Sequence, residues 1–150
     1  MRGPYGLCSI AKGDKYYKKY NTRDDAPYWR GPIWININYL AIRALNHYSK
    51  LPGPYQTLSK TIYTQLRNSI VENMYSEYTR TGYIWEQYDC KTGKGQSVHP
   101  FTGWSSLVVL IMGEQYWYVK LLMFYRYIDV DFENVFSRRN QMQAGFYQEF

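Results

Sequence analysis

The sequence Ile33-Trp34-Ile35-Asn36-Ile37-Asn38-Tyr39-Leu40-Ala41-Ile42-Arg43-Ala44-Leu45 is apolar nearly all round when it is wound as a helix. Pro32 precedes it and suits a first helical turn, where no backbone N–H is needed, and Pro52-Gly53-Pro54 ends the segment. A helix without a wholly polar face is expected to be buried on more than one side. The stretch therefore predicts an inner helix of a helical fold.

The next two apolar segments complete this pattern. The first repeats an apolar residue every four positions among polar ones and should end at Gly82, which predicts an outer helix with one buried stripe. Residues 103–112 are again apolar on most faces and predict a second inner helix, although residues 107–112 alone would also fit a buried strand. The order inner, outer, loop, inner is what a barrel of paired helices gives, so we expect an all-α fold. The stripe of the outer helix consists of Leu58, Ile62, Leu66, Ile70 and Met74.

The composition is that of a globular protein with a surplus of aromatic residues. The chain has 150 residues, 45% hydrophobic and 20% charged, and carries 18 Tyr, 6 Phe and 5 Trp. Either carbohydrate contact or a large aromatic core would use that surplus. The net charge of +6 permits an anionic partner, but no basic stripe concentrates it, so we expect no nucleic-acid partner. Four lysines in a Tyr-rich loop are interpreted as a solvated face: Lys12, Lys15, Lys18 and Lys19.

The cysteines and histidines give no sign of a metal site. Cys8 and Cys90 lack metal-ligand spacing and are expected to be two unrelated thiols. A disulfide between them would be possible only in an oxidising compartment. His47 and His99 also lack ligand spacing, so no metal is expected. The most apolar candidate for a membrane segment, residues 117–128, is too short to span a bilayer and is interrupted by charges.

The stretch Trp85-Glu86-Gln87-Tyr88 sets one carboxylate among aromatic rings and leads into a loop with spaced glycines. Pyranose rings offer flat C–H faces for stacking, and glycosidic bonds are cleaved by carboxyl groups, so the stretch indicates a sugar site. Hydrolysis takes two carboxyl groups, and this stretch supplies one. A plain surface glutamate is the alternative reading of Glu86.

Four short segments, in this order and at suitable spacing, resemble the C-terminal end of the catalytic domain of glycoside hydrolase family 63. The resemblance implies that residues 1–116 are part of an (α/α)6 barrel, a fragment of a helical toroid. Residues 117–150 resemble nothing in the family and are expected to form a helix followed by a disordered end. The four segments are Tyr5-Gly6-Leu7, Pro27-Tyr28-Trp29-Arg30-Gly31-Pro32-Ile33-Trp34-Ile35-Asn36, Gly82-Tyr83-Ile84-Trp85-Glu86-Gln87-Tyr88 and Pro100-Phe101-Thr102-Gly103-Trp104-Ser105-Ser106-Leu107.

The resemblance also implies a reaction. Members invert the anomeric centre, and the complete enzyme would remove the terminal α-1,2-linked glucose from the triglucosylated N-glycan precursor in the endoplasmic reticulum lumen. Glu86 would be the general base, whereas the general acid, an Asp, would lie upstream and is absent from this chain. The implied partner is an N-linked oligosaccharide, with no cofactor and with membrane attachment only through an upstream anchor. The expected substrate-binding residues are Tyr28, Trp29, Arg30, Trp34, Trp85, Tyr88, Phe101 and Trp104.

Two points limit what is carried over. Cys8 and Ile10 depart from the family pattern Gly-Leu-Arg-Ser-Leu, so a charged contact near this segment is expected to be lost. Arg30 could bind sugar hydroxyls, hold a carboxylate ionised, or belong to a structural ion pair. The alternative function is that of a non-catalytic helical fragment that binds a glycan or a protein partner through exposed aromatic surface.

Overall fold

The computed structural model describes residues 2–113, and these are mostly helical. The long helices are α1 (Ile35–Lys50) and α2 (Gln56–Thr81), and the short 3-10 helix η1 (Trp104–Leu107) leads into α3 (Val108–Gly113). Four two-residue strands pair as two antiparallel ladders: β1 (Arg2–Gly3) with β2 (Gly6–Leu7), and β3 (Gln87–Tyr88) with β4 (Gly95–Gln96). The expected helical class is confirmed. Closure into a barrel stays a prediction, and the expectations for residues 117–150 lie outside the described residues.

Helix α1 begins two residues later than the apolar run because Ile33 takes part in a small sheet. The N–H of Ile33 donates to the carbonyl of Tyr88 at 2.8 Å, and the N–H of Tyr88 donates back at 3.0 Å. Trp34 is still extended, with φ −111° and ψ 124°. Burial on more than one side is not seen within the described residues, and the inner position of α1 in a barrel stays a prediction. One face of α1 is buried, while Ile37 and Leu40 on the opposite face are 46% and 63% exposed.

Helix α2 has the expected single buried stripe, which runs along the whole helix. Leu66, Ile70 and Met74 are buried as predicted and Ile62 is half-buried, whereas Leu58 is 55% exposed. A four-residue spacing drifts around a helix of 3.6 residues per turn, so Ser59 and Tyr63 take the buried positions in the first turns. The helix ends at Gly82, which adopts the left-handed conformation with φ 77° and donates its N–H to Tyr78. This confirms the predicted stop. Polar residues of α2 that hold neighbouring segments also belong to the buried stripe: Arg67, Asn73 and Glu77.

The apolar run at residues 103–112 is helical, as η1 followed by α3, and its inner position in a barrel stays a prediction. Arg67 of α2 is buried and donates to the carbonyls of Ile111 and Met112, both at 3.0 Å. The contact holds α3 against α2.

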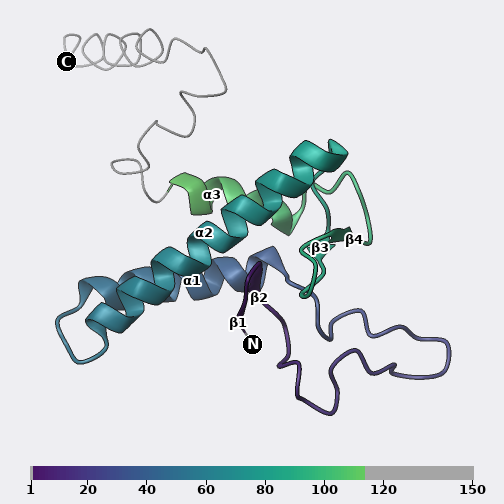
Figure 1. Cartoon of the computed structure of the whole chain (residues 1–150), viewed down its shortest axis with the longest axis horizontal. Coiled ribbons are helices and arrows are strands. Elements are labelled where there is room, and N and C mark those ends of the chain that lie inside the picture. The colour runs from purple at the N-terminus through teal and green to yellow at the C-terminus, as the bar shows by residue number, and fades with distance from the viewer. Residues whose placement is uncertain (1, 114–150) are drawn as a thin grey trace, which may run out of the picture. The chain divides into compact units, whose positions relative to one another are not determined.

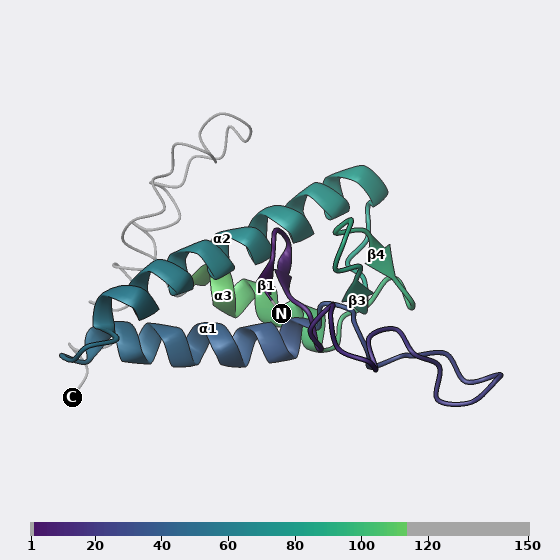
Figure 2. The same cartoon turned by 60° about the horizontal axis from the view of Figure 1, so that its bottom comes forward.

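The amino-terminal hairpin is attached to both long helices. Asn38 of α1 is fully buried, accepts the N–H of Leu7 at 2.8 Å and donates to the carbonyl of Leu7 at 3.0 Å. Gly6 approaches α2 so closely that a Cβ there would meet the side chain of Ile70. In Figure 2, α1 and α2 diverge from the turn that joins them, and the β1–β2 hairpin lies in the opening between them.

Cys8 and Cys90 form a disulfide, with 5.7 Å between their Cα atoms, so the expectation of two unrelated thiols is wrong. Backbone bridges pair Cys8, just after the hairpin, with Ile33, and pair Ile33 with Tyr88 at the end of β3. Cys90 lies two residues after Tyr88. This register sets the two sulfurs side by side although they lie 82 positions apart. The disulfide sits in a core made up of Cys8, Ile33, Ile35, Ile42, Tyr63, Leu66, Ile70, Met74, Tyr88, Cys90 and Ile111.

A long loop spanning residues 9–32 projects away from the helices in Figure 1 and returns to Ile33 at the small sheet. The β3–β4 pair lies near the C-terminal end of α2. Within residues 2–113, no helix combines the length and the apolar character that crossing a membrane requires.

Candidate active site

Glu86 lies immediately before β3 and is held there through its backbone. Its N–H donates to the carbonyl of Val98 at 3.0 Å, and its carbonyl accepts the indole N–H of Trp104 at 2.8 Å. The hydroxyl of Ser105 donates to the carbonyl of the preceding residue, Trp85, at 2.6 Å. Contacts from the loop after β4 and from η1 thus fix the position of Glu86 on two sides.

The carboxylate of Glu86 is buried and receives hydrogen bonds on both oxygens. The phenolic O–H of Tyr28 donates to Oε1, and the N–H of Val98 donates to Oε2 at 3.3 Å. Within the described residues, no lysine or arginine forms an ion pair with this carboxylate. Partial burial, followed by the hydrogen bond to Glu86 and its charge, raises the pKa of Tyr28 to about 12. Tyr28 therefore keeps its proton at neutral pH and acts as a donor.

Aromatic rings from three segments gather next to this carboxylate. The rings of Trp29 and Trp34 stack with centroids 4.2 Å apart, and Tyr28 contacts both edge to face at 5.3 and 5.0 Å. Trp34 also contacts Trp104 at 5.6 Å, and Trp104 contacts Phe101 at 4.7 Å. We call these five residues the aromatic wall. Trp34 is 1% exposed, whereas Trp29 is 57% exposed, so the wall runs from the core to the surface.

The other expected site residues lie outside the wall. The indole N–H of Trp85 donates to the hydroxyl of Thr81 at 3.2 Å, and its ring contacts that of His99 at a tilt, with centroids 3.8 Å apart. Tyr88 is fully buried, and its hydroxyl accepts the N–H of Trp85 at 3.3 Å. Arg30 donates to the carbonyl of Lys19 at 2.9 Å, away from Glu86. Their roles in binding substrate stay predictions, as does the role of each ring of the wall.

Asp89 organises the loop after Glu86, and the sequence patterns did not single it out. Its carboxylate accepts the ammonium group of Lys18 and the N–H of Lys91, both at 2.8 Å, and the N–H of Thr92 at 2.9 Å. Burial acts to raise the pKa of Asp89, but these donors outweigh it and lower the pKa to about 2. An Asp four residues before Gly93 is the signal that could have indicated this turn.

Glu77 is a second buried carboxylate near the site, and it is fully engaged in structural contacts. It accepts two hydrogen bonds from the guanidinium of Arg80, at 3.0 and 2.5 Å, and the N–H of Gly95 at 2.9 Å. The hydrogen bond from Arg80 is the main cause of the lowered pKa of Glu77. Glu77 thereby holds β4 onto the end of α2, and β4 in turn pairs with β3.

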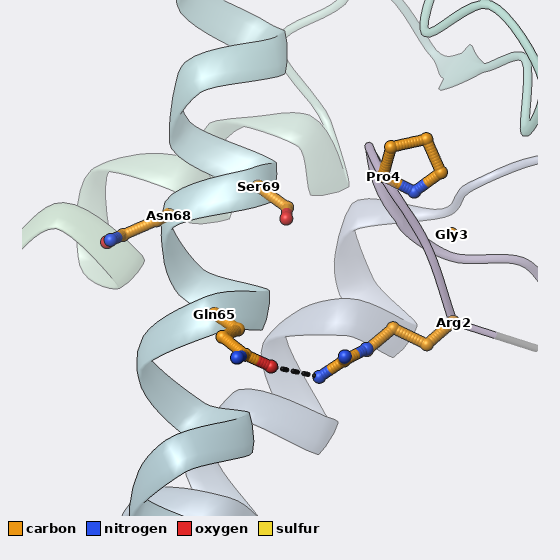
Figure 3. A pocket seen from close by; sticks show the side chains of 6 residues that line it. All are labelled: Arg2, Gly3, Pro4, Gln65, Asn68 and Ser69. Atoms are coloured by element: carbon orange, nitrogen blue, oxygen red, sulfur yellow. Dashed lines mark hydrogen bonds between the residues drawn. The ribbon is translucent and has the colours of Figure 1, made fainter.

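A pocket of about 540 Å³ lies on another part of the molecule. It is formed where the hairpin meets α2, and Figure 3 shows Arg2 of the hairpin bound to Gln65 of α2, at 2.5 Å. Neither Glu86 nor any member of the aromatic wall lines this pocket. Within residues 2–113, no group of three or more His, Cys, Asp or Glu side chains is placed to hold a metal ion.

Residues 1–114 match the model of the glycosyl hydrolase family 63 C-terminal domain. A mannosyl-oligosaccharide glucosidase, GCS1, from Arabidopsis thaliana is 54% identical over 112 residues, covering 75% of this chain and 13% of the relative. Alpha-glucosidase 2 from the same plant is 49% identical over 112 residues, with coverages of 75% and 14%. A probable mannosyl-oligosaccharide glucosidase from Schizosaccharomyces pombe is 49% identical over 114 residues, with coverages of 75% and 14%. The chain thus spans about one seventh of the length of these relatives.

Proposed function

Because this chain belongs to glycosyl hydrolase family 63, we propose that it is the C-terminal portion of the catalytic domain of a mannosyl-oligosaccharide glucosidase. The complete enzyme removes the terminal α-1,2-linked glucose from the triglucosylated N-glycan precursor with inversion of the anomeric centre. Glu86 is its general base. The general acid comes from a part of the enzyme that this chain does not contain.

The observation that carries this proposal is a buried, hydrogen-bonded carboxylate at the edge of the aromatic wall. An inverting glycosidase keeps its two carboxyl groups about 6.5–9.5 Å apart, so that the base can take a proton from a water between itself and the sugar. Tyr28 and Val98 donate hydrogen bonds to the two oxygens of the Glu86 carboxylate, so this side chain is held in place for the role of general base. The exposed face of Trp29 suits stacking against a pyranose ring.

The exposed apolar faces of the helices support a place in an (α/α)6 barrel. Ile37 and Leu40 of α1 are half to two-thirds exposed, as are Val109 and Leu110 of α3. Isolated soluble domains seldom leave such residues uncovered on neighbouring helices. In the complete enzyme, the other helices of the barrel cover these faces. The sequence-based prediction that α1 is an inner helix then refers to its place in the complete barrel.

The Cys8–Cys90 disulfide supports the endoplasmic reticulum lumen as the location of the enzyme. Disulfides form and persist in oxidising compartments and are rare in the cytosol. The substrate is then an N-linked oligosaccharide that is processed in the same lumen. Attachment to the membrane is the task of a segment outside this chain.

A chimera tests the proposal. Residues 1–114 replace the matching segment of Arabidopsis GCS1, and glucose released from a triglucosylated oligosaccharide is measured. The chimera should be active, and Glu86→Gln should lower kcat by about 10²–10⁴-fold, the usual contribution of a general base. Glu72→Gln, on the exposed face of α2, is the matched control and should leave kcat unchanged. An inactive chimera, or an active one that tolerates Glu86→Gln, overturns the proposal.

A further inference from the structure

We propose that Tyr28 is a positioning residue, whose hydroxyl fixes the orientation of the Glu86 carboxylate toward the attacking water. This inference rests on the proposed role of Glu86 as general base. The sequence indicated another role for Tyr28, as a ring that contacts sugar. The structure places its hydroxyl on Oε1 of Glu86 instead, across 58 residues of chain.

Tyr28 is the main donor to this carboxylate among the described residues. The other donor, the N–H of Val98, reaches Oε2 at 3.3 Å, which is long for a hydrogen bond. Val98 is also 57% exposed and lies in the loop that follows β4. Without the hydroxyl of Tyr28, the carboxylate would keep only this weaker contact and could rotate about its terminal bond.

The segment around Tyr28 is itself held in place. Edge-to-face contacts with Trp29 and Trp34 restrict its ring. The hydroxyl of Ser9 donates to the carbonyl of Trp29 at 2.6 Å, and the N–H of Gly31 donates to the same hydroxyl at 2.8 Å. A hydroxyl that is fixed in this way can fix its partner in turn.

The hydroxyl of Tyr28 keeps its proton at neutral pH, because its pKa is raised to about 12. It therefore stays a hydrogen-bond donor to Oε1 of Glu86. We assign Tyr28 an effect on the rate through geometry, because a misplacement of about 1 Å at a reacting group can cost about 10²-fold in rate.

The test uses the same chimera and separates kcat from KM. Tyr28→Phe keeps the ring and removes only the hydroxyl, and we expect kcat to fall about 10- to 100-fold while KM changes less than about 2-fold. Tyr20→Phe, an exposed tyrosine of the same loop, is the matched control and should change neither constant. An unchanged kcat, or a loss that appears only in KM, overturns the inference.

A double variant asks whether Tyr28 acts through Glu86. If it does, Tyr28→Phe combined with Glu86→Gln should be no slower than Glu86→Gln alone, because both remove the same function. Effects that multiply would show an independent role for Tyr28 and would refute positioning. Thermal melting of each variant verifies that it is folded. Loss of activity in the unsubstituted chimera would refute the proposed function, whereas an active chimera that tolerates Tyr28→Phe refutes this inference alone.

Discussion

Replacing both Cys8 and Cys90 with serine should destabilise this chain strongly. The disulfide joins positions 82 residues apart, and a loop of that length closed by a cross-link removes about 15 cal/mol/K of entropy from the unfolded chain. At 25 °C this corresponds to about 4.5 kcal/mol, toward the upper end of what native disulfides contribute. Small domains have a total free energy of unfolding of only about 5–15 kcal/mol, so the loss would be a large part of the whole.

Urea unfolding of the 150-residue chain, followed by tryptophan fluorescence, measures this effect. With a urea slope of about 1.5–2 kcal/mol per M, the double variant should unfold about 2–3 M earlier than the oxidised parent chain. Reductant is the control, because it should lower the midpoint of the parent chain by the same amount and leave the double variant unchanged. A parent chain whose midpoint does not respond to reductant would refute the disulfide and the reasoning built on it.

Three further predictions concern other contacts. Asp89→Asn should cost at most about 2 kcal/mol, from a shift of its pKa from 3.8 to about 2, because the exposed Lys18 partner is screened by water. The pKa of Asp89 is lower in the folded state than in the unfolded state, so its contribution to stability is complete above pH 3.8 and is lost as the pH falls through about 2. Urea midpoints measured at several pH values would show this loss. Asn38→Leu should cost about 2–4 kcal/mol in the same assay, because it leaves the N–H and carbonyl of Leu7 unpaired, and a midpoint equal to that of the parent chain would contradict this. The isolated chain should enhance ANS fluorescence more than the chimera does, because the apolar faces of α1 and α3 are exposed only in the former; equal enhancement would contradict the barrel.

Local signals in the sequence account for the helices. Pro52-Gly53-Pro54 separates α1 from α2, and Gly82 supplies the left-handed residue that ends α2. The sequence predicted a start of α1 that is too early, because Pro32 and Ile33 directly precede a strongly helical segment. In the structure, Tyr88, 55 positions away, pairs with Ile33 and holds it extended. Pairings of this kind depend on the path of the chain, which a one-dimensional pattern does not contain.

The candidate site was predictable in composition and not in arrangement. The aromatic setting of Glu86 and the run from Tyr28 to Trp34 could be recognised from the sequence. Their contact could not, because it depends on the small sheet that brings the two segments together. The structural roles of Glu77 and Asp89 were missed for a similar reason, since a carboxylate that binds backbone N–H groups looks like any surface charge until the loop is folded.

The disulfide also gives the chain a ring topology. The backbone from Cys8 to Cys90 forms one covalent circle that carries both long helices and Glu86, and most of the loop at residues 11–26 on this circle is exposed. A protease that cuts the loop once opens the circle but releases no piece, because the two strands of the break remain linked through sulfur. Such a nicked molecule would run as one species until it is reduced, and it would keep the β1–β2 hairpin covalently attached to the segment that carries Glu86.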